Sequence, residues 1–467
     1  MANLFSFCEY IIAPDRRSVL LVYESLHTTA CHPFTERVLF PSPLPETQGV
    51  QDLLRLLHFV SGISYYKLFL PERFQHPYTV SVQESSFLND VFSLGLREFM
   101  YTNRLSEDRM ARFPDGHGVD RGGCQTGRQT ESALLGLGGG KDSVVAGELL
   151  KTLGILSEAF VVVTDKVPPH VEDVARMMGT ELLVVRRILD EVLTGLSRRP
   201  GAYNGHIPVS AIYGIIGCLV ALSRGHVFVT VGNESSASIP CTVWKGLKIN
   251  HQWSKSLHFE RLLQSRLAAM GLAVNYFSPI RPLNAISVAG LFSMYPQYFH
   301  VFTSDSASFR IDPERRPETR WSLGSVKSLS SYILLLPWVG ESELRAMFGR
   351  DFLCEPGLKG MLLQLLGASS TPALDCVGTP SELRLSIEAA LAQGKCQDSG
   401  LVAHAVELGL VSAQTGATAP LADGLTASME QAFPIGIADR LFSTIAAHLK
   451  TCRESQTHAV KQAGAAT

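Results

Sequence analysis

Between residues 133 and 232 the sequence alternates short apolar, β-branched runs with segments of helical spacing, and this alternation restricts the fold more than any other feature. The apolar runs are ALLGL (133–137), AFVVVTD (159–165), ELLVVRR (181–187) and HVFVTVG (226–232). Strands joined through helices pair in parallel and carry helices on both faces of the sheet. The segment therefore predicts an α/β fold. Because ligands of open parallel sheets bind beyond the carboxyl ends of the strands, we expect the loops after Leu137, Asp165 and Gly232 to face one crevice.

Composition shifts divide the 467-residue chain into predicted parts. These are an N-terminal α+β domain (1–120), the parallel-sheet domain (121–310), a mainly helical C-terminal region (311–450) and a disordered tail (451–467). The stretch DGHGVDRGGCQTGRQT, residues 115–130, is rich in glycine and charge and marks the first boundary.

Local patterns predict individual elements outside the sheet domain. Residues 20–22 and 38–40 are β-like, and residues 50–69 carry apolar side chains at helical spacing. We expect further helices over 334–348 and 380–393.

Charge and cysteine usage exclude several classes of protein. Lys and Arg number 41 and Asp and Glu 43, a net charge of −2, so no overall field attracts a polyanion and no nucleic-acid partner is expected. The nine cysteines include no CxxC pair, and the N-terminus lacks the basic-then-apolar order of a secretory signal. The uncharged run 207–223 contains Pro208 and reads as a buried helix, so no membrane partner is expected. We predict a cytoplasmic protein.

The strongest local motif is GGGKDS, which directly follows a predicted strand and opens a helix. Gly138, Gly139 and Gly140 leave backbone N–H groups uncovered, and the N-terminus of the following helix favours negative charge. This combination predicts a cradle for pyrophosphate. Neither the Walker A loop nor the dinucleotide fingerprint fits, because the former needs Ser or Thr where Asp142 stands and the latter needs Gly where Lys141 stands.

Two polar stretches accompany this loop. GNESSAS, residues 232–238, follows another predicted strand, and Glu234 beside small hydroxyl residues could hold Mg²⁺ or a ribose hydroxyl, or could cap a helix. NHQWSKS, residues 250–256, places His251 among many hydrogen-bonding side chains, which favours a functional over a structural histidine.

GGGKDS resembles the signature of the PP-loop (N-type) ATP pyrophosphatases, which have a HUP-like parallel sheet and cleave ATP between its α and β phosphates. The resemblance implies AMP transfer to a substrate oxygen, with ATP and Mg²⁺ required. By position, the three glycines and Ser143 would hold pyrophosphate, Lys141 would counter its charge, and Asp142 with Glu234 would place Mg²⁺. Gly232 and Asn233 would complete the nucleotide site.

The remaining motifs resemble one family, the UDP-N-acetylmuramoyl-L-alanyl-L-glutamate epimerases of bacterial cell-wall synthesis. The matching pieces are GISYYK (62–67), GLREFMYTN (95–103), GGGKDS, GNESSAS, NHQWSKS and CVGT (376–379). The resemblance implies that ATP-dependent adenylation of a terminal L-glutamate precedes inversion of its α-carbon to the D form. The implied partner is a nucleotide-linked or other peptide ending in L-glutamate.

Proton transfer at the α-carbon needs positioned bases, for which we select His251 and Cys376, with Lys255 as a further catalytic residue. An inert structural role for Cys376 remains open. Lys255, Arg281 or Lys67 could pair with the substrate carboxylates.

The chain departs from the family pattern at four positions. The family carries cysteines, consistent with a structural zinc site, where this sequence has Asp305, Ser322, Ser325 and Ser328. Serine hydroxyls are poor zinc ligands, so we predict no zinc there. Alternative functions are an epimerase acting on a peptide natural product, an adenylating amide ligase, and an inactive nucleotide-binding protein.

Overall fold

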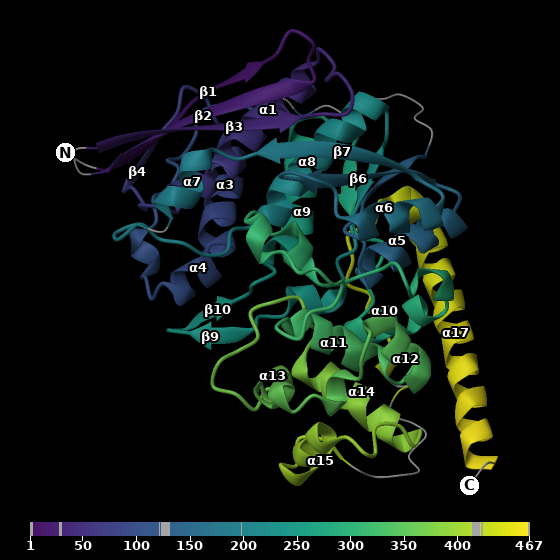
Figure 1. The fold of residues 1–467 in the computed structure, drawn as a ribbon. Helices are drawn as coiled ribbons and strands as arrows, with labels where there is room; N and C mark the ends of the chain where they lie inside the picture. Colours follow the sequence, from purple (N-terminus) through teal and green to yellow (C-terminus); the bar gives the residue numbers. More distant parts are fainter. Residues whose placement is uncertain are drawn as a thin grey trace.

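The computed structural model describes residues 3–27, 30–120, 122, 131–197, 199–412, 421 and 424–465. Its centre is a nine-stranded sheet in the order β11-β8-β5-β6-β7-β3-β2-β1-β4 (Figure 1). The strands are β1 (Leu4–Ile12), β2 (Ser18–His27), β3 (Ala30–Leu39), β4 (Arg73–Gln75), β5 (Ala133–Gly136), β6 (Leu156–Val163), β7 (Glu181–Ile188), β8 (Phe228–Thr230) and β11 (Asn275–Phe277).

The strands from β11 to β7 pair in parallel, as the alternating sequence predicts. Helices connect them because the chain must return to the same end of the sheet before each new parallel strand begins. The helices of the first 300 residues are α1 (Gln48–Ser61), α2 (Ile63–Tyr66), α3 (Val82–Gly95), α4 (Arg97–Thr102), α5 (Lys141–Thr152), α6 (Pro169–Met178), α7 (Glu191–Leu196), α8 (Val209–Arg224), α9 (Leu257–Ala269) and α10 (Ala285–Ser293).

Side chains of the central strands alternate between two hydrophobic cores. Ala133 and Leu135 of β5 enter a core with α5, α6 and α10, whereas Leu134 enters a second core with α1, α3, α8 and α9. The parallel sheet is therefore covered on both faces, as predicted. The uncharged run of the sequence forms α8, most of whose residues are buried. Among the described residues, none of the helices is both long and apolar enough to cross a membrane.

The N-terminal strands extend this same sheet. β3 pairs antiparallel with β7, and β2 and β1 continue the antiparallel order, with β4 parallel to β1 at the edge. Glu36 of β3 and Arg187 of β7 form a buried ion pair, with Nε to Oε1 at 2.8 Å. Strands from the predicted 1–120 and 121–310 parts thus share one sheet. Much of the predicted boundary stretch, residue 121 and residues 123–130, lies outside the described residues.

The C-terminal part adds helices beneath the sheet domain, and its last helix runs along one side of the molecule (Figure 1). They are α11 (Val326–Leu335), α12 (Glu341–Phe348), α13 (Lys359–Leu365), α14 (Pro380–Ala392), α15 (Gly400–Glu407) and α17 (Ile435–Ala465). The helix predicted over 334–348 is wrong as a single element, because the segment containing Pro337 separates α11 from α12 and proline cannot continue a helical ladder. α17 extends through residues 451–465, which the sequence pattern assigned to the tail.

Short elements complete the fold. β9 (Thr242–Trp244) and β10 (Leu247–Ile249) form a hairpin that projects from the body between the GNESSAS and NHQWSKS motifs (Figure 1). The 3₁₀ turns are η1 (Glu107–Arg109), η2 (Ser235–Ser238), η3 (Trp253–Lys255), η4 (Pro296–Tyr298), η5 (Ser306–Phe309), η6 (Pro313–Arg315), η7 (Phe352–Cys354) and η8 (Pro356–Leu358).

Candidate active site

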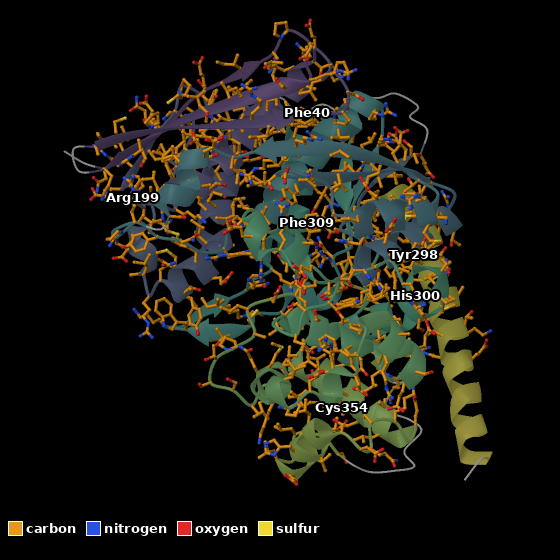
Figure 2. The ribbon with its side chains drawn as sticks, viewed as in Figure 1. Phe40, Arg199, Tyr298, His300, Phe309 and Cys354 are labelled. Atoms are coloured by element: carbon orange, nitrogen blue, oxygen red, sulfur yellow. The ribbon has the colours of Figure 1, made fainter. Side chains whose placement is uncertain are left out.

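The glycine loop connects β5 to α5. Gly139 has a φ of 76°, a left-handed conformation that glycine adopts without strain, and a Cβ added there would lie 2.5 Å from His170 Cδ2. Phe309, labelled in Figure 2, packs edge-on against the same imidazole at 6.0 Å between ring centroids. A Cβ added at Gly138 would instead meet no atom within 4 Å. The backbone at Gly138 therefore borders open space beside the start of α5.

The loop after β8 touches the first turn of α5 at backbone level. A Cβ at Gly232 would lie 2.7 Å from the carbonyl carbon of Asp142 and 2.8 Å from the amide nitrogen of Ser143. Asn233 is buried and exchanges hydrogen bonds with the Ser278 hydroxyl, at 3.0 and 2.8 Å. The structure thus brings together the two motifs that the sequence assigned to the nucleotide.

Three carboxylates act on the ammonium of Lys141, one of them in direct contact. Its Nζ lies 2.6 Å from Asp142 Oδ1. Burial alone would lower the pKa of Lys141, but the charges of Asp142, Glu234 and Glu382 raise it above its ordinary value. Burial, followed by the charges of Glu382 and Asp142, raises the pKa of Glu234 to about 7. Carboxylate oxygens at this position could hold a divalent cation.

Glu382 joins this cluster from α14. Its carboxylate accepts hydrogen bonds from the Ser236 hydroxyl at 2.9 Å and from the backbone N–H groups of Ala285 at 2.7 Å and Thr379 at 2.6 Å. It therefore connects the loop after β8 with the CVGT motif. The sequence pattern Thr379-Pro-Ser-Glu382 is that of a capping box, which the structure contains, and this local role conceals the contact with Ser236.

The three predicted catalytic residues gather in a second cluster beside this one. Lys255 Nζ donates to Cys376 Sγ at 3.2 Å. His251 Nε2 lies 3.9 Å from Oδ1 of Asp375, the residue that precedes Cys376. Asp375 Oδ1 also accepts from the Cys376 N–H at 2.8 Å and from Lys327 Nζ at 3.1 Å.

The cations and carboxylates of this cluster alter one another's proton affinity. Burial opposes ionisation of Asp375, but Lys327 and His251 hold its pKa below the ordinary value. Burial likewise opposes the charge of Lys327, but Cys376 and Asp375 raise its pKa well above the ordinary value.

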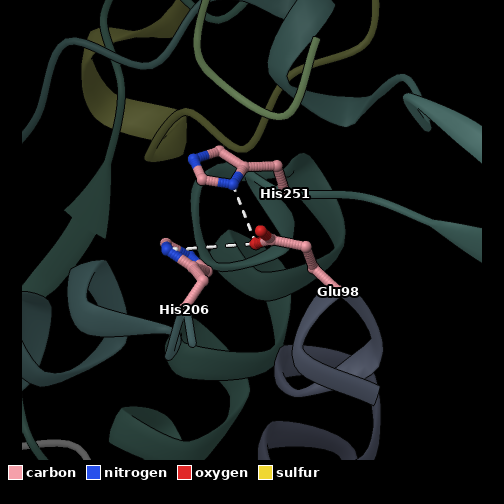
Figure 3. Close-up of side chains that lie close together, drawn as sticks. All are labelled: Glu98, His206 and His251. Atoms are coloured by element: carbon pink, nitrogen blue, oxygen red, sulfur yellow. Dashed lines mark hydrogen bonds and ion pairs between the residues drawn. The ribbon is translucent and has the colours of Figure 1, made fainter. Parts of the chain in front are cut away.

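Glu98 and His206 complete the surroundings of His251 (Figure 3). His251 Nδ1 lies 2.8 Å from Glu98 Oε2, and His206 Nδ1 lies 4.0 Å from the same oxygen. The ligand atoms of the three residues all lie within 4.8 Å of one another, a spacing that could hold a metal ion. Burial, with smaller contributions from neighbouring positive charges, lowers the pKa of His206 to about 3.

One guanidinium group joins the two clusters. Arg281 is 1% exposed, donates from Nη1 to the Glu234 carbonyl at 2.8 Å and from Nη2 to the Lys255 carbonyl at 2.6 Å, and pairs with Glu260 at 2.8 Å. These bonds occupy Arg281 in holding the motifs together. Lys67 is buried, and its Nζ donates to the Gly205 carbonyl at 2.7 Å.

The four positions that differ from the family's cysteines also lie together. Ser328 Oγ donates to Asp305 Oδ2 at 3.1 Å and accepts from the Ser322 N–H at 3.1 Å, and the Ser325 N–H donates to the Ser322 carbonyl at 3.2 Å. Ser304, next to Asp305, accepts from the Lys141 N–H at 3.4 Å through its Oγ. A hydrogen-bonded cluster thus supports the segment that covers the glycine loop.

Sequence reasoning therefore located both clusters but missed five of their members. These residues are Glu98, His206, Lys327, Asp375 and Glu382. Each has a partner far away in the sequence, although Asp375 and Glu382 also bond to residues close to them in the chain. A carboxylate directly before Cys376 was an available signal. No local pattern indicated that Lys327 or His206 would reach the site.

The fold and the paired clusters define a mixed α/β protein with a glycine loop at the head of a helix and a group of titratable side chains held beside it. The family model described as the MurL N-terminal domain matches residues 1–279, and that of the MurL C-terminal domain matches residues 301–418. The chain belongs to the MurL family, as its motifs predicted, and is an enzyme.

Curated relatives carry the name UDP-N-acetyl-alpha-D-muramoyl-L-alanyl-L-glutamate epimerase. The protein from Salinispora tropica is 32% identical over 87% of this chain and 88% of its own length. One from Micromonospora sp. is 32% identical over 87% and 90%, and one from Xanthomonas oryzae pv. oryzae is 31% identical over 76% and 78%.

Proposed function

We propose that this enzyme adenylates the carboxylate of a terminal L-glutamate with ATP and inverts its α-carbon, with UDP-N-acetylmuramoyl-L-alanyl-L-glutamate as the substrate. The name of the relatives supports this choice of peptide substrate and the inversion of its glutamate residue. The observation that carries the proposal is that the Arg281 guanidinium donates to the carbonyl oxygens of both Glu234 and Lys255. These bonds hold the proposed phosphate-binding region beside the cluster of proposed proton-transfer groups.

The proposed nucleotide site is the glycine loop of a PP-loop ATP pyrophosphatase fold. The open space over Gly138 suits phosphoryl oxygens, which would accept from backbone N–H groups at the N-terminus of α5. Lys141 would counter their charge, and Asp142 and Glu234 offer the oxygen ligands that Mg²⁺ takes. The ion would neutralise charge on the leaving pyrophosphate.

Adenylation explains why a nucleotide is needed for inversion. Removing a proton beside a free carboxylate places a second negative charge on one carbon framework. Formation of the mixed anhydride with AMP removes the first charge and makes the carbonyl an electron sink. His251 and Cys376 then take and return the α-proton on opposite faces, with Lys255 holding the Cys376 sulfur. Water finally hydrolyses the acyl adenylate, which releases AMP and the free carboxylate of the inverted residue.

The test is incubation with ATP, Mg²⁺ and UDP-N-acetylmuramoyl-L-alanyl-L-glutamate in D₂O. The expected products are AMP, pyrophosphate and a peptide with deuterium at the glutamate α-carbon and D configuration. AMP without deuterium would contradict inversion and favour an amide ligase. Absence of turnover would contradict this substrate; the altered residues at Asp305 and Ser328 make a peptide natural product the next one to assay.

Substitution of Asp142 tests the nucleotide site separately. We expect Asp142→Ala to reduce AMP formation at least 100-fold, since one of the cation's carboxylates and the partner of Lys141 are lost. The measurement is pyrophosphate release, and Asp173→Ala on the exposed surface is the matched control. Normal release by Asp142→Ala would refute the assignment of the loop.

A further inference from the structure

We propose that Glu98 is a positioning residue that fixes the protonation site of His251, so that Nε2 is the atom that takes the substrate proton. This inference rests on the proposed role of His251 as a base. Glu98 comes from α4 in the N-terminal segment, about 150 residues from His251, and its side chain is buried beneath the cluster.

The hydrogen bond between the two residues determines the tautomer. Glu98 Oε2 lies 2.8 Å from His251 Nδ1, within the distance of a charge-assisted hydrogen bond. An ionised carboxylate has no proton to donate, so the shared hydrogen belongs to Nδ1. The neutral imidazole then carries its free electron pair on Nε2.

The second ring nitrogen of His251, Nε2, lies on the side of Asp375. Nε2 lies 3.9 Å from Asp375 Oδ1, which is too far for a hydrogen bond. That oxygen already accepts from Lys327 and from the Cys376 N–H. Nε2 therefore retains its electron pair on the side of Asp375, the residue that precedes Cys376.

The imidazole of His206 packs against that of His251 but lies too far from Glu98 to compete for its hydrogen bond. The two rings lie 4.2 Å apart between centroids at an interplanar angle of 35° (Figure 3). The low pKa of His206 keeps it uncharged, so Glu98 is left to stabilise the charge on His251. This tilted ring contact and the hydrogen bond to Glu98 together restrict the imidazole of His251 to one orientation.

The proton balance of the step follows. Nε2 gains the α-proton, and the electron pair of the broken C–H bond moves into the carbonyl of the acyl adenylate. The resulting imidazolium holds one proton on each nitrogen, and the Glu98 carboxylate stabilises it through Nδ1–H. The carbon regains a proton from the Cys376 thiol on the opposite face, and exchange with water restores both groups.

The test compares Glu98→Gln with Glu84→Gln in the full-length protein. Glutamine keeps the shape of the side chain but can donate to Nδ1, which transfers the imidazole hydrogen to Nε2. We expect deuterium exchange at the α-carbon to fall about 10²–10⁴-fold in kcat with little change in KM, while pyrophosphate release stays within about twofold. Glu84 is a buried carboxylate paired with Arg55, so its substitution reproduces the loss of a buried charge without touching an imidazole.

A second measurement does not depend on turnover or on the stability of a variant. In ¹⁵N-histidine-labelled wild-type protein, with His251→Gln used to assign the signal, we expect a protonated Nδ1 and an unprotonated Nε2. Equal exchange rates in the two glutamine variants, or a wild-type His251 protonated at Nε2 instead, would overturn the proposal. If the wild type lacks adenylation altogether, the proposed function fails, whereas the ¹⁵N signal still decides whether Glu98 sets the tautomer.

Discussion

At the scale of single residues, His58 is an imidazole buried on all sides in the N-terminal core. Its ring nitrogens lie 2.7 Å from the Tyr78 hydroxyl and 3.0 Å from the Val22 carbonyl oxygen. Burial lowers the pKa of His58 from 6.5 to about 4. Between these two pH values the unfolded chain therefore binds a proton that the folded chain does not, so stability is full above pH 6.5 and falls as the pH drops towards 4.

This difference predicts the acid sensitivity of the fold. We expect wild-type protein to lose about 3 kcal/mol more stability than His58→Gln between pH 6.5 and pH 4, from a shift of that size at 1.36 kcal/mol per pH unit. Urea unfolding at a series of pH values measures it. His300→Gln, at an exposed position, should keep the wild-type pH dependence. Parallel curves for wild type and His58→Gln would contradict the prediction.

At the scale of elements, the glycine loop has two adjacent positions that differ in their tolerance of a side chain. Gly139→Ala places a side chain in a left-handed conformation and against His170, so we expect it to destabilise the fold by about 1–3 kcal/mol. Gly138→Ala adds a methyl group to open space, so stability should change by less than about 0.5 kcal/mol.

Measurement of nucleotide binding should show whether the loop holds phosphoryl groups, as proposed, or only links the strand to the helix. The added methyl of Gly138→Ala would occupy the space proposed for phosphoryl oxygens, so we expect ATP affinity to fall at least tenfold in a normally folded variant. Calorimetric titration with ATP and Mg²⁺, alongside thermal unfolding, measures both effects. Wild-type affinity in Gly138→Ala would contradict the proposed cradle.

Elements of this chain were predictable where a local pattern determines them. The β-branched runs around Leu135 and Val162 and the glycines between strand and helix have local physical causes, and the structure contains them. Pro337 is a local signal for the end of a helix. The apolar spacing continues on both sides of it, however, and this led to the prediction of a single helix. Contacts such as Glu98 with His251 could not be predicted, because they depend on how α4 packs against a loop 150 residues later.

At the scale of the whole molecule, one sheet joins the N-terminal strands to the parallel strands through β3 and β7. The buried pair of Glu36 and Arg187 sits at this junction, and Arg187 also donates to the Ser64 hydroxyl at 2.9 Å. Burial opposes the charge of Arg187, but Glu36 raises its pKa above the ordinary value. Arg187 is therefore charged in the folded protein.

Removal of one partner should weaken the entire sheet. We expect Arg187→Met to lower the free energy of unfolding by about 3–5 kcal/mol, because Glu36 is left buried without a counter-charge, and Glu36→Gln in the same chain to restore part of the loss. Chemical denaturation measures both. Arg176→Met, which breaks an exposed pair with Asp173, should cost less than about 1 kcal/mol. Equal losses from the buried and the exposed substitution would contradict the prediction.

The charges of Asp142, Glu234 and Glu382 near Lys141 have a consequence for the order in which the proposed nucleotide and its metal ion would bind. Even with Glu234 partly protonated near neutral pH, acidic groups at this place outnumber the single ammonium. A polyphosphate approaching without a counter-ion would be repelled by like charge. The nucleotide is therefore expected to enter already complexed to its divalent ion, so that free triphosphate in excess of magnesium acts as a poor substrate.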